Sequence, residues 1–294
     1  MATATGESGA QPGLAIRPTG SALGAEICGV DLAADLSDEM IGAIRDAWHE
    51  HLVLLFRGQT LDDERLIAFG RRFGELHRTE GLAYGGKPDG TAPEIEIISN
   101  QPEDGVPPGA RPSDEATWHT DMSMFEKPAS ASILYAVDVP SGVGRTRFAN
   151  LYQAWETLPA EIAGQVEEAR SIHDFAYTAM GELRAGFESV TDKSKGPGAA
   201  HPIVRTHPGT GRKALYLGRN GYGYILGRKV EDSDRLLTEL WVHMTRPEFV
   251  WHHDWRNGDV VMWDNRCCTH AREAFDSQIP RRLRRVTVLG EIPV

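Results

Sequence analysis

The sequence has few cysteines and no long hydrophobic run. The chain of 294 residues contains three cysteines, Cys28, Cys267 and Cys268. An odd count with two adjacent residues argues against a disulfide framework and favours a reducing cytoplasm. No stretch approaches the ~20 apolar residues that a membrane span needs. Residues 1–13 also lack the basic region and apolar core of a signal peptide, so we expect a disordered lead-in there and a single domain over residues 14–294.

Basic residues are in the minority. The chain has 31 Lys and Arg against 42 Asp and Glu, a formal net charge of −11. Such a charge argues against nucleic-acid binding as the main function. It does not exclude a small anionic ligand, because a local group of arginines can oppose the overall sign.

Short strands dominate the predicted secondary structure. Capping residues and helical spacing predict helices that begin after Ser37 and extend over Leu61–Phe73, Tyr152–Arg170 (interrupted near Pro159) and Glu231–Met244. Strands are predicted over Ala15–Val30 (two strands), Leu52–Phe56, Glu94–Ser99, Ala131–Val137, Thr146–Leu151, His201–Arg205, Ala214–Leu217, Phe249–His253, Asp259–Trp263 and Leu283–Gly290. The pattern favours a mainly β fold with α-helical insertions, a barrel or jelly-roll sandwich.

A turn signal lies between two of these strands. Asn257-Gly258 is typical of a two-residue hairpin loop. The sequence therefore predicts that the strands over residues 249–253 and 259–263 pair with each other.

The stretch from Trp118 to Asp121 contains the first chemical motif. If it is extended, His119 and Asp121 point to the same face and can bind one divalent metal. A third ligand would complete the triad of two histidines and one carboxylate that is typical of non-haem Fe(II) oxygenases. Taken alone, a His-x-Asp motif is more often a surface histidine near an aspartate.

Residues near the C-terminus supply the candidate partners. His270 follows the strand over residues 259–263 and is the best candidate for the third ligand. Arg281 and Arg285 lie further on and share one face of an extended strand. Two buried guanidinium groups are reasonable if each binds a carboxylate or similar oxyanion. A solvated basic edge strand is the alternative.

These motifs and several others resemble the TauD/TfdA family of Fe(II)- and 2-oxoglutarate-dependent dioxygenases over nearly the full length. The stretches that carry the resemblance are Phe56-Arg57-Gly58-Gln59, Phe73-Gly74-Glu75-Leu76, Trp118-His119-Thr120-Asp121, residues 201–208 from His201 to Pro208, Trp263-Asp264-Asn265-Arg266 and the arginine-rich strand that begins at Arg281. The resemblance implies a double-stranded β-helix, or jelly roll, with a cupin-like core. It also implies an enzyme that uses Fe(2+), 2-oxoglutarate and O2 to hydroxylate a substrate and that forms succinate and carbon dioxide.

The resemblance implies roles for individual residues. His119, Asp121 and His270 match the iron ligands. Arg281 and Thr146 match the residues that bind the distal carboxylate of 2-oxoglutarate. No catalytic residue beyond the metal centre is expected.

The substrate pocket is less closely defined. Arg285 matches the arginine that commonly holds the acidic group of the primary substrate, and Asn100 and Thr79 are expected to line the pocket. Thr79 and Glu115 stand near the places where taurine enzymes carry His and Asn, which argues against taurine. Ile98-Ser99-Asn100 and the arginine-rich strand resemble the aryloxyalkanoate branch, in which hydroxylation leads to ether cleavage. A sulfonate or sulfate ester (taurine-like) substrate or a natural product would use the same core.

The expected function is hydroxylation of a small anionic organic substrate. We expect no nucleic-acid or membrane partner, a cytoplasmic location and a homo-oligomer of two or more subunits. Two rival classes remain from the sequence. One is a sensor or binding module that holds metal and 2-oxoglutarate without turnover, and the other is a cupin-type metal hydrolase or isomerase.

Overall fold

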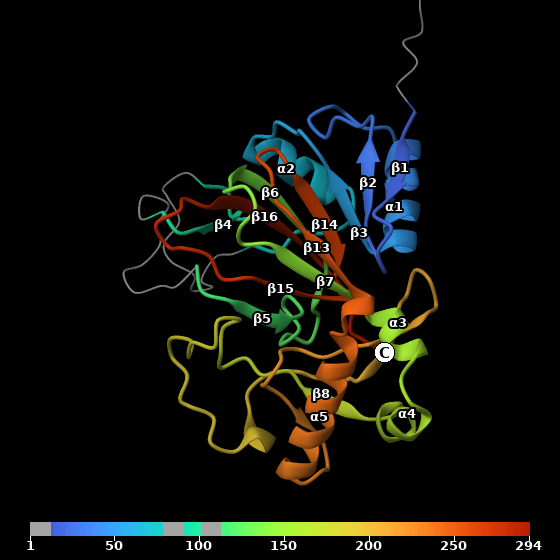
Figure 1. Cartoon of the computed structure of the whole chain (residues 1–294), viewed down its shortest axis with the longest axis vertical. Coiled ribbons are helices and arrows are strands. Elements are labelled where there is room, and N and C mark those ends of the chain that lie inside the picture. Colours follow the sequence, from blue (N-terminus) through green and yellow to red (C-terminus); the bar gives the residue numbers. More distant parts are fainter. Residues whose placement is uncertain (1–12, 79–90, 102–112) are drawn as a thin grey trace, which may run out of the picture.

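Two β-sheets form the centre of the molecule (Figure 1). The computed structural model describes residues 13–78, 91–101 and 113–294. Thr79 and all of the expected lead-in except Gly13 lie outside the described residues. The helices are α1 (Asp38–His51), α2 (Asp63–Arg71), α3 (Leu151–Glu156), α4 (Ala160–Val166) and α5 (Val230–Met244), with short 3-10 helices η2 (Lys193–Lys195) and η3 (Pro247–Phe249).

The larger sheet has seven strands in the order β1-β2-β3-β14-β6-β16-β4. Its strands are β1 (Ala15–Pro18), β2 (Ala25–Cys28), β3 (Val53–Phe56), β4 (Glu96–Ser99), β6 (Ala129–Asp138), β14 (Val260–Asp264) and β16 (Arg282–Leu289). Neighbouring strands are antiparallel, except that β2 and β3 are parallel. The apolar strands β3, β14 and β6 lie side by side in the middle because their side chains are buried on both faces.

The smaller sheet has the order β13-β7-β15-β5. Its strands are β5 (Ala116–His119), β7 (Thr146–Asn150), β13 (Val250–His253) and β15 (Cys268–Arg272). The two sheets share one core, in which Phe148 of β7 belongs to the same buried cluster as Leu134 of β6 and Leu283 of β16. This arrangement confirms the predicted mainly β, jelly-roll fold with helical insertions.

Helices α1 and α2 cover the outer face of the larger sheet. Ile44 of α1 and Leu66 of α2 pack in one cluster with Ile133 and Val286 of the sheet. The predicted cap of α1 is also present, since the Ser37 side chain accepts a hydrogen bond from the Met40 amide. The two faces of the larger sheet therefore differ: the outer face packs against helices, and the inner face looks toward the smaller sheet.

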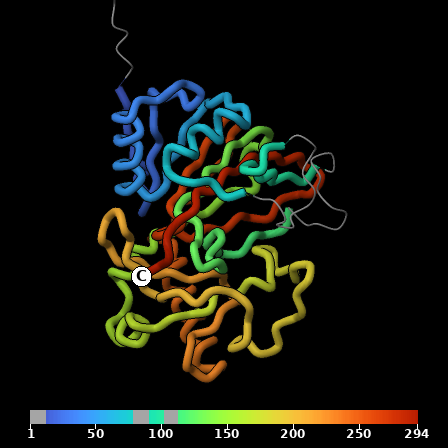
Figure 2. The backbone as a smooth tube through the Cα atoms, turned by 180° about the vertical axis from the view of Figure 1, so that it is seen from behind, coloured from blue at the N-terminus to red at the C-terminus, as the bar shows by residue number. Residues whose placement is uncertain are grey.

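The segment between β7 and β13 forms a separate layer beside the smaller sheet (Figure 2). It contains α3, α4 and α5 and two small sheets. Their strands are β8 (Arg170–Ile172), β9 (Ala200–Pro202) and β12 (Tyr224–Ile225) in one, and β10 (Val204–Thr206) and β11 (Lys213–Leu215) in the other. Pro159 separates α3 from α4, as predicted.

The predicted hairpin around Asn257-Gly258 is wrong. β13 pairs with β7 in the smaller sheet, whereas β14 pairs with β3 and β6 in the larger sheet. The turn therefore carries the chain from one sheet to the other. It is anchored to β6, because the Asn257 side chain accepts a hydrogen bond from the Val139 amide and the Gly258 amide donates to the Ala136 carbonyl.

Candidate metal centre

Two neighbouring strands of the smaller sheet bring the predicted histidines together. His119 at the end of β5 is the register partner of His270 in β15, and their ring centroids are 4.2 Å apart. The sequence placed His270 after a strand, but it lies inside β15, a strand that was not predicted. Direct cross-strand pairing explains why residues so distant in the sequence share one site.

Asp121 completes the group from a turn. β5 ends at His119, so the expectation of an extended stretch through Asp121 is wrong. The turn nevertheless directs the carboxylate toward the two rings. Its Oδ1 lies 3.7 Å from Nε2 of His119 and 3.9 Å from Nε2 of His270. The ligand atoms of the three residues all lie within 4.8 Å of one another, so one metal ion can contact all three.

The three side chains have the protonation states that a metal ion requires. Nδ1 of His119 lies 2.7 Å from the Thr117 carbonyl oxygen, which can only accept, so Nδ1 carries the proton and Nε2 remains available. Burial lowers the pKa of both histidines. Burial opposes ionisation of Asp121, but Arg285 and the two histidines outweigh it and hold the pKa of this carboxyl low. Neutral imidazoles and an ionised carboxylate are the forms that bind metal.

A chain of hydrogen bonds fixes the second oxygen of Asp121. The Ser132 hydroxyl donates to Asp121 Oδ2 at 2.7 Å, and Nδ2 of Asn265 donates to the Ser132 hydroxyl at 3.0 Å. Nε1 of Trp263 in turn donates to Asn265 Oδ1 at 3.0 Å. Sequence reasoning missed Ser132, whose only signal is a hydroxyl inside the apolar run of β6. The chain holds Oδ1 toward the histidines.

Arg281 is a buried cation in the segment that leads into β16. Its side chain is 3% exposed, its Nε has no hydrogen-bond partner, and it forms no ion pair within the described ranges. Burial, with a smaller effect of Arg272, lowers its pKa to about 9, so the group remains charged at neutral pH. A buried charge without a counter-ion is costly. The site is therefore suited to an anionic ligand.

Thr146 and Arg272 lie near Arg281. Nε of Arg281 is 3.5 Å from the position that a Cβ on Gly144 would occupy, which places the guanidinium beside the start of β7. Thr146 is the first residue of β7, and its buried hydroxyl accepts a hydrogen bond from Trp255. Arg272, which sequence reasoning missed, lies over the same Phe275 ring as Arg281, at 5.2 and 5.7 Å from the ring centroid.

Arg285 reaches the metal centre from β16. Its Nη1 is 3.1 Å from Asp121 Oδ1, whereas Nε and Nη2 lie 3.1 and 2.7 Å from Glu96 Oε2. Arg284 points to the opposite face and contacts Asp63 of α2. The predicted alternation is confirmed for Arg284 and Arg285, whereas Arg281 lies before β16 and the register of β16 shifts between Arg282 and Leu283. The alternative of a solvated basic edge strand is wrong because β6 and β4 flank β16.

Asn100 holds the segment before β16. Its Nδ2 donates to the carbonyl oxygens of Ser277 and Ile279 at 3.2 and 2.8 Å. Its Oδ1 accepts a hydrogen bond from the Arg281 amide at 2.8 Å. These hydrogen bonds fix the position of the backbone that carries Arg281. Its predicted place in the substrate pocket stays a prediction, and that of Thr79 lies outside the described residues.

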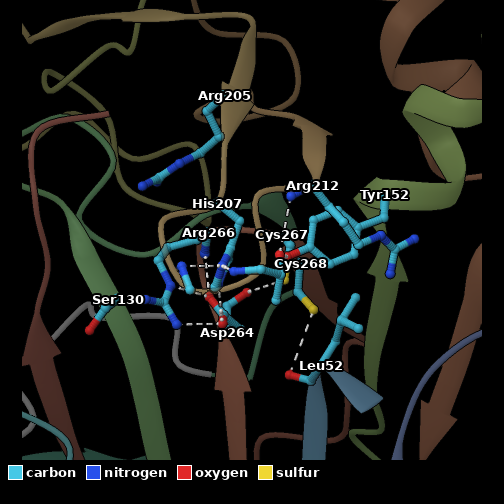
Figure 3. Close-up of polar contacts among 12 residues, drawn as sticks. Leu52, Ser130, Tyr152, Arg205, His207, Arg212, Asp264, Arg266, Cys267 and Cys268 are labelled. Atoms are coloured by element: carbon cyan, nitrogen blue, oxygen red, sulfur yellow. Dashed lines mark hydrogen bonds and ion pairs between the residues drawn. The ribbon is translucent and has the colours of Figure 1, made fainter. Parts of the chain in front are cut away.

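A second cluster with ligand-type side chains lies at the C-terminal end of β14 and contains His207, Asp264 and Cys267 (Figure 3). Both oxygens of Asp264 accept hydrogen bonds from Arg266, at 2.8 and 2.7 Å. Nδ1 of His207 accepts from two backbone amides, so Nε2 carries the proton and donates to Asp264 at 3.0 Å. These atoms are already engaged, and the cluster is a hydrogen-bonded support and not a metal site.

A cavity of about 620 Å³ lies away from the metal centre. It is lined by Leu61, Asp62, Asp63, Glu64, Tyr135, Val137 and Arg284. These residues belong to the outer side of the larger sheet and the start of α2. The cavity contains none of the predicted site residues, so its size carries no weight for the chemistry.

Two histidines and one carboxylate at the edge of a two-sheet β core define the class of non-haem Fe(II) oxygenases. The family model "Taurine catabolism dioxygenase TauD, TfdA family" matches residues 15–287. The chain belongs to the TauD/TfdA family.

Curated relatives and solved structures agree with this assignment. The chain is 33% identical to pentalenolactone F synthase of Streptomyces avermitilis over 299 residues, which cover 94% of each chain. It is 34% identical to the alpha-ketoglutarate-dependent 2,4-dichlorophenoxyacetate dioxygenase of Burkholderia sp. strain RASC, over 88% of this chain and 89% of that one. A taurine dioxygenase structure from Burkholderia xenovorans has a TM-score of 0.79 at 34% identity and covers 96% of this chain and 91% of that chain.

The protein is therefore a 2-oxoglutarate-dependent dioxygenase that uses Fe(2+), 2-oxoglutarate and O2. This result disfavours both the binding module and the cupin-type hydrolase or isomerase. None of the described helices combines the length and hydrophobicity that a membrane crossing requires.

Proposed function

We propose that the enzyme hydroxylates a small organic acid that binds beside the metal centre. The observation that carries this proposal is the guanidinium of Arg285, whose Nη1 lies 3.1 Å from the metal-facing oxygen of Asp121. A substrate whose acidic group contacts Arg285 would hold its neighbouring carbon atoms close to the metal. Fixing a C–H bond in that position is the main task of the protein in such a reaction.

His119, Asp121 and His270 would hold the iron. Three protein ligands leave neighbouring positions open for the co-substrate and for oxygen. When bound, iron and 2-oxoglutarate supply the oxidising power for hydroxylation. The surrounding residues of this chain keep the three metal-binding side chains in the protonation states that iron requires. They also hold these side chains in the buried space between the two sheets.

Arg281 and Thr146 would hold the distal carboxylate of 2-oxoglutarate. Arg281 has the buried, unpaired charge that such a carboxylate would neutralise, and Thr146 supplies a hydroxyl nearby in β7. A guanidinium can donate two parallel hydrogen bonds to a carboxylate, which fixes its orientation as well as its position.

The candidate substrates are acids of three kinds. The 34% identical relative acts on 2,4-dichlorophenoxyacetate, so an aryloxyalkanoate with ether cleavage is our first candidate. A sulfonate or sulfate ester and a natural product are alternatives, given the taurine dioxygenase structure and the pentalenolactone F synthase. In each case Arg285 would hold the acidic group of the substrate.

Substrate-coupled turnover tests this proposal. The iron-loaded enzyme would receive 2-oxoglutarate and oxygen with a phenoxyacetate, an alkylsulfonate or an alkyl sulfate, and succinate and oxidised product would be measured. We expect at least one acid to stimulate succinate formation with an equal amount of product, whereas its uncharged methyl ester or amide does not. Stimulation by the uncharged analogues alone would contradict the proposal.

A further inference from the structure

Thr146 lies in a row of side chains next to the metal centre. It is the register partner of Arg272 in β15 and of His253 in β13, so the three side chains leave the smaller sheet on the same face. His270 lies two residues before Arg272 on that face, about 7 Å along the strand. Thr146 is therefore placed for the far end of a short diacid whose near end is at the metal.

The Thr146 hydroxyl accepts one hydrogen bond and donates none to the described part of the chain. Nε1 of Trp255 lies 3.0 Å from Thr146 Oγ1, and both residues are buried. An indole N–H can only donate, so the hydroxyl is the acceptor in this bond. A hydroxyl has one proton and two lone pairs. Trp255 occupies one lone pair, and the proton remains available for a further partner.

The surroundings of this hydrogen bond distinguish it from an ordinary core contact. A buried indole usually finds some acceptor, so the bond taken alone would carry no functional meaning. Here the acceptor lies two residues after Gly144, which is beside the guanidinium of Arg281. The unused hydroxyl proton therefore lies in the same region as a buried cation that has no counter-ion among the described residues. A carboxylate satisfies both groups.

The turn between β13 and β14 holds the Trp255 ring in place. The ring packs edge-on against His253, with the two centroids 4.5 Å apart. Asp259, which is fully buried, accepts hydrogen bonds from the Arg256 amide at 2.9 Å and from Arg57 Nη1 at 2.6 Å. These contacts fix the backbone directly after the indole. The direction of the indole N–H is therefore set before a ligand binds.

We propose that Trp255 is a positioning residue for the co-substrate. Its N–H occupies one lone pair of the Thr146 hydroxyl and so directs the hydroxyl proton toward the distal carboxylate of 2-oxoglutarate. Without the indole N–H, the hydroxyl can rotate and turn its proton away from the carboxylate. This inference rests on the proposed function, in which Thr146 and Arg281 hold that carboxylate. It adds a residue that no sequence motif singled out.

A set of variants separates the indole N–H from the packing of the ring. Trp255→Phe removes the donor together with part of the ring volume. Site-specific replacement of the Trp255 indole by benzothiophene removes the donor and keeps the shape, so it decides the question if the phenylalanine variant folds poorly. Thr146→Val removes the hydroxyl and keeps the shape of the side chain. Trp155→Phe is the matched control, at a half-buried tryptophan of α3 whose ring lies near Lys213.

Binding measurements on these variants test the proposal. Each protein is loaded with Fe(II) and titrated anaerobically with 2-oxoglutarate, and Fe(II) affinity is measured separately by competition with a coloured chelator. We expect both Trp255 replacements to weaken 2-oxoglutarate binding about tenfold, because the oriented hydrogen bond to the carboxylate is lost. Fe(II) affinity should stay unchanged. Trp155→Phe should bind 2-oxoglutarate as the wild type does.

A double variant provides the sharpest readout. In the Thr146→Val background, replacing Trp255 should weaken 2-oxoglutarate binding no further, because the two side chains act through one hydrogen bond. Losses that multiply, a parallel fall of Fe(II) affinity, an equal loss in Trp155→Phe or normal binding by the benzothiophene protein would overturn the inference alone. Wild-type 2-oxoglutarate affinity in Thr146→Val would contradict the proposed role of Thr146 itself, and the inference with it.

Discussion

At the scale of single residues, Arg281 is the strongest indication that the protein binds an anionic ligand. It is a buried cation that no carboxylate within the described ranges neutralises. A residue that only fills the core does not need this charge, because an apolar side chain of similar size would make the folded state more stable. A ligand that brings its own negative charge supplies the reason.

Replacing Arg281 by leucine should therefore separate binding from stability. We expect the affinity for 2-oxoglutarate to fall about 100-fold or more, because a buried charge pair can no longer form. The free energy of unfolding of the metal-free protein should be unchanged or higher, because an unpaired buried charge is removed. Anaerobic titration with 2-oxoglutarate and urea denaturation provide the two measurements.

Arg284→Leu is the control for that variant. Arg284 lies three residues further on, in β16, and faces Asp63 on the outer side of the sheet. It should keep the wild-type affinity for 2-oxoglutarate. If both variants lost the same affinity, or if Arg281→Leu lost none, the assignment of Arg281 would be wrong.

Ser132 offers a second test at this scale. Ser132→Ala removes the hydrogen bond to Asp121 Oδ2, so the carboxylate is held less firmly. We expect Fe(II) affinity to fall about 10- to 100-fold. Competition with a coloured chelator measures this, with Ser130→Ala as the control because Ser130 bonds to backbone carbonyls of the neighbouring strand. Equal affinities in the two variants would contradict the role of Ser132.

At the scale of elements, periodicity predicted most strands and all long helices. The apolar runs and the Ser37 cap placed α1, β3 and β6 correctly, because burial on a fixed face leaves a repeating pattern. Periodicity does not determine which of the two sheets a strand joins. A local turn signal at Asn257-Gly258 predicted a hairpin, whereas the pairing of β13 and β14 is decided by distant partners.

The functional strands were harder to recognise than the functional residues. β15 has the sequence Cys-Thr-His-Ala-Arg, which lacks the apolar alternation of an ordinary strand because His270 serves the site. The type and number of candidate ligands were clear from the sequence. Ser132 was not, because its importance depends on a hydrogen bond to Asp121, a contact distant in the sequence that no local pattern reveals.

Asn100 should affect 2-oxoglutarate binding by holding the segment that precedes β16. Its side chain makes three hydrogen bonds to the backbone of residues 277–281, so Asn100→Ala should loosen the position of Arg281. We expect about a tenfold loss of 2-oxoglutarate affinity with Fe(II) affinity unchanged. Gln278→Ala, at an exposed position in the same segment, is the control. Unaltered 2-oxoglutarate binding in Asn100→Ala would contradict this role.

At the scale of the whole molecule, the cluster around Asp264 joins the core sheets to the segment between β7 and β13. Asp264 connects Arg266, which follows β14, with His207 in the turn between β10 and β11. Asp264→Asn would leave Arg266 buried without its counter-ion. We expect the free energy of unfolding to fall by about 3–5 kcal/mol.

Metal content distinguishes this cluster from the metal centre. The wild type and Asp264→Asn should both bind one equivalent of Fe(II) per chain, because His207 and Asp264 are already engaged in hydrogen bonds. Elemental analysis after dialysis, together with urea denaturation, measures both quantities. A second equivalent in the wild type that is lost in Asp264→Asn would contradict this interpretation.

The assembly and location of the protein stay predictions. The described cysteines are all free. Sedimentation analysis would test the expected homo-oligomer, and a purely monomeric protein would contradict it. Fractionation of the producing cells would test the cytoplasmic location.

The central claim is that His119, Asp121 and His270 hold one iron to which 2-oxoglutarate binds under the control of Arg281. Anaerobic titration of 2-oxoglutarate into the protein with one equivalent of Fe(II) tests it directly. We expect a visible charge-transfer band that saturates at one 2-oxoglutarate per chain, that is absent in His119→Ala and that needs far more 2-oxoglutarate in Arg281→Leu. Iron that is bound to the wild-type protein and gives no band would contradict this assignment of the metal and 2-oxoglutarate sites.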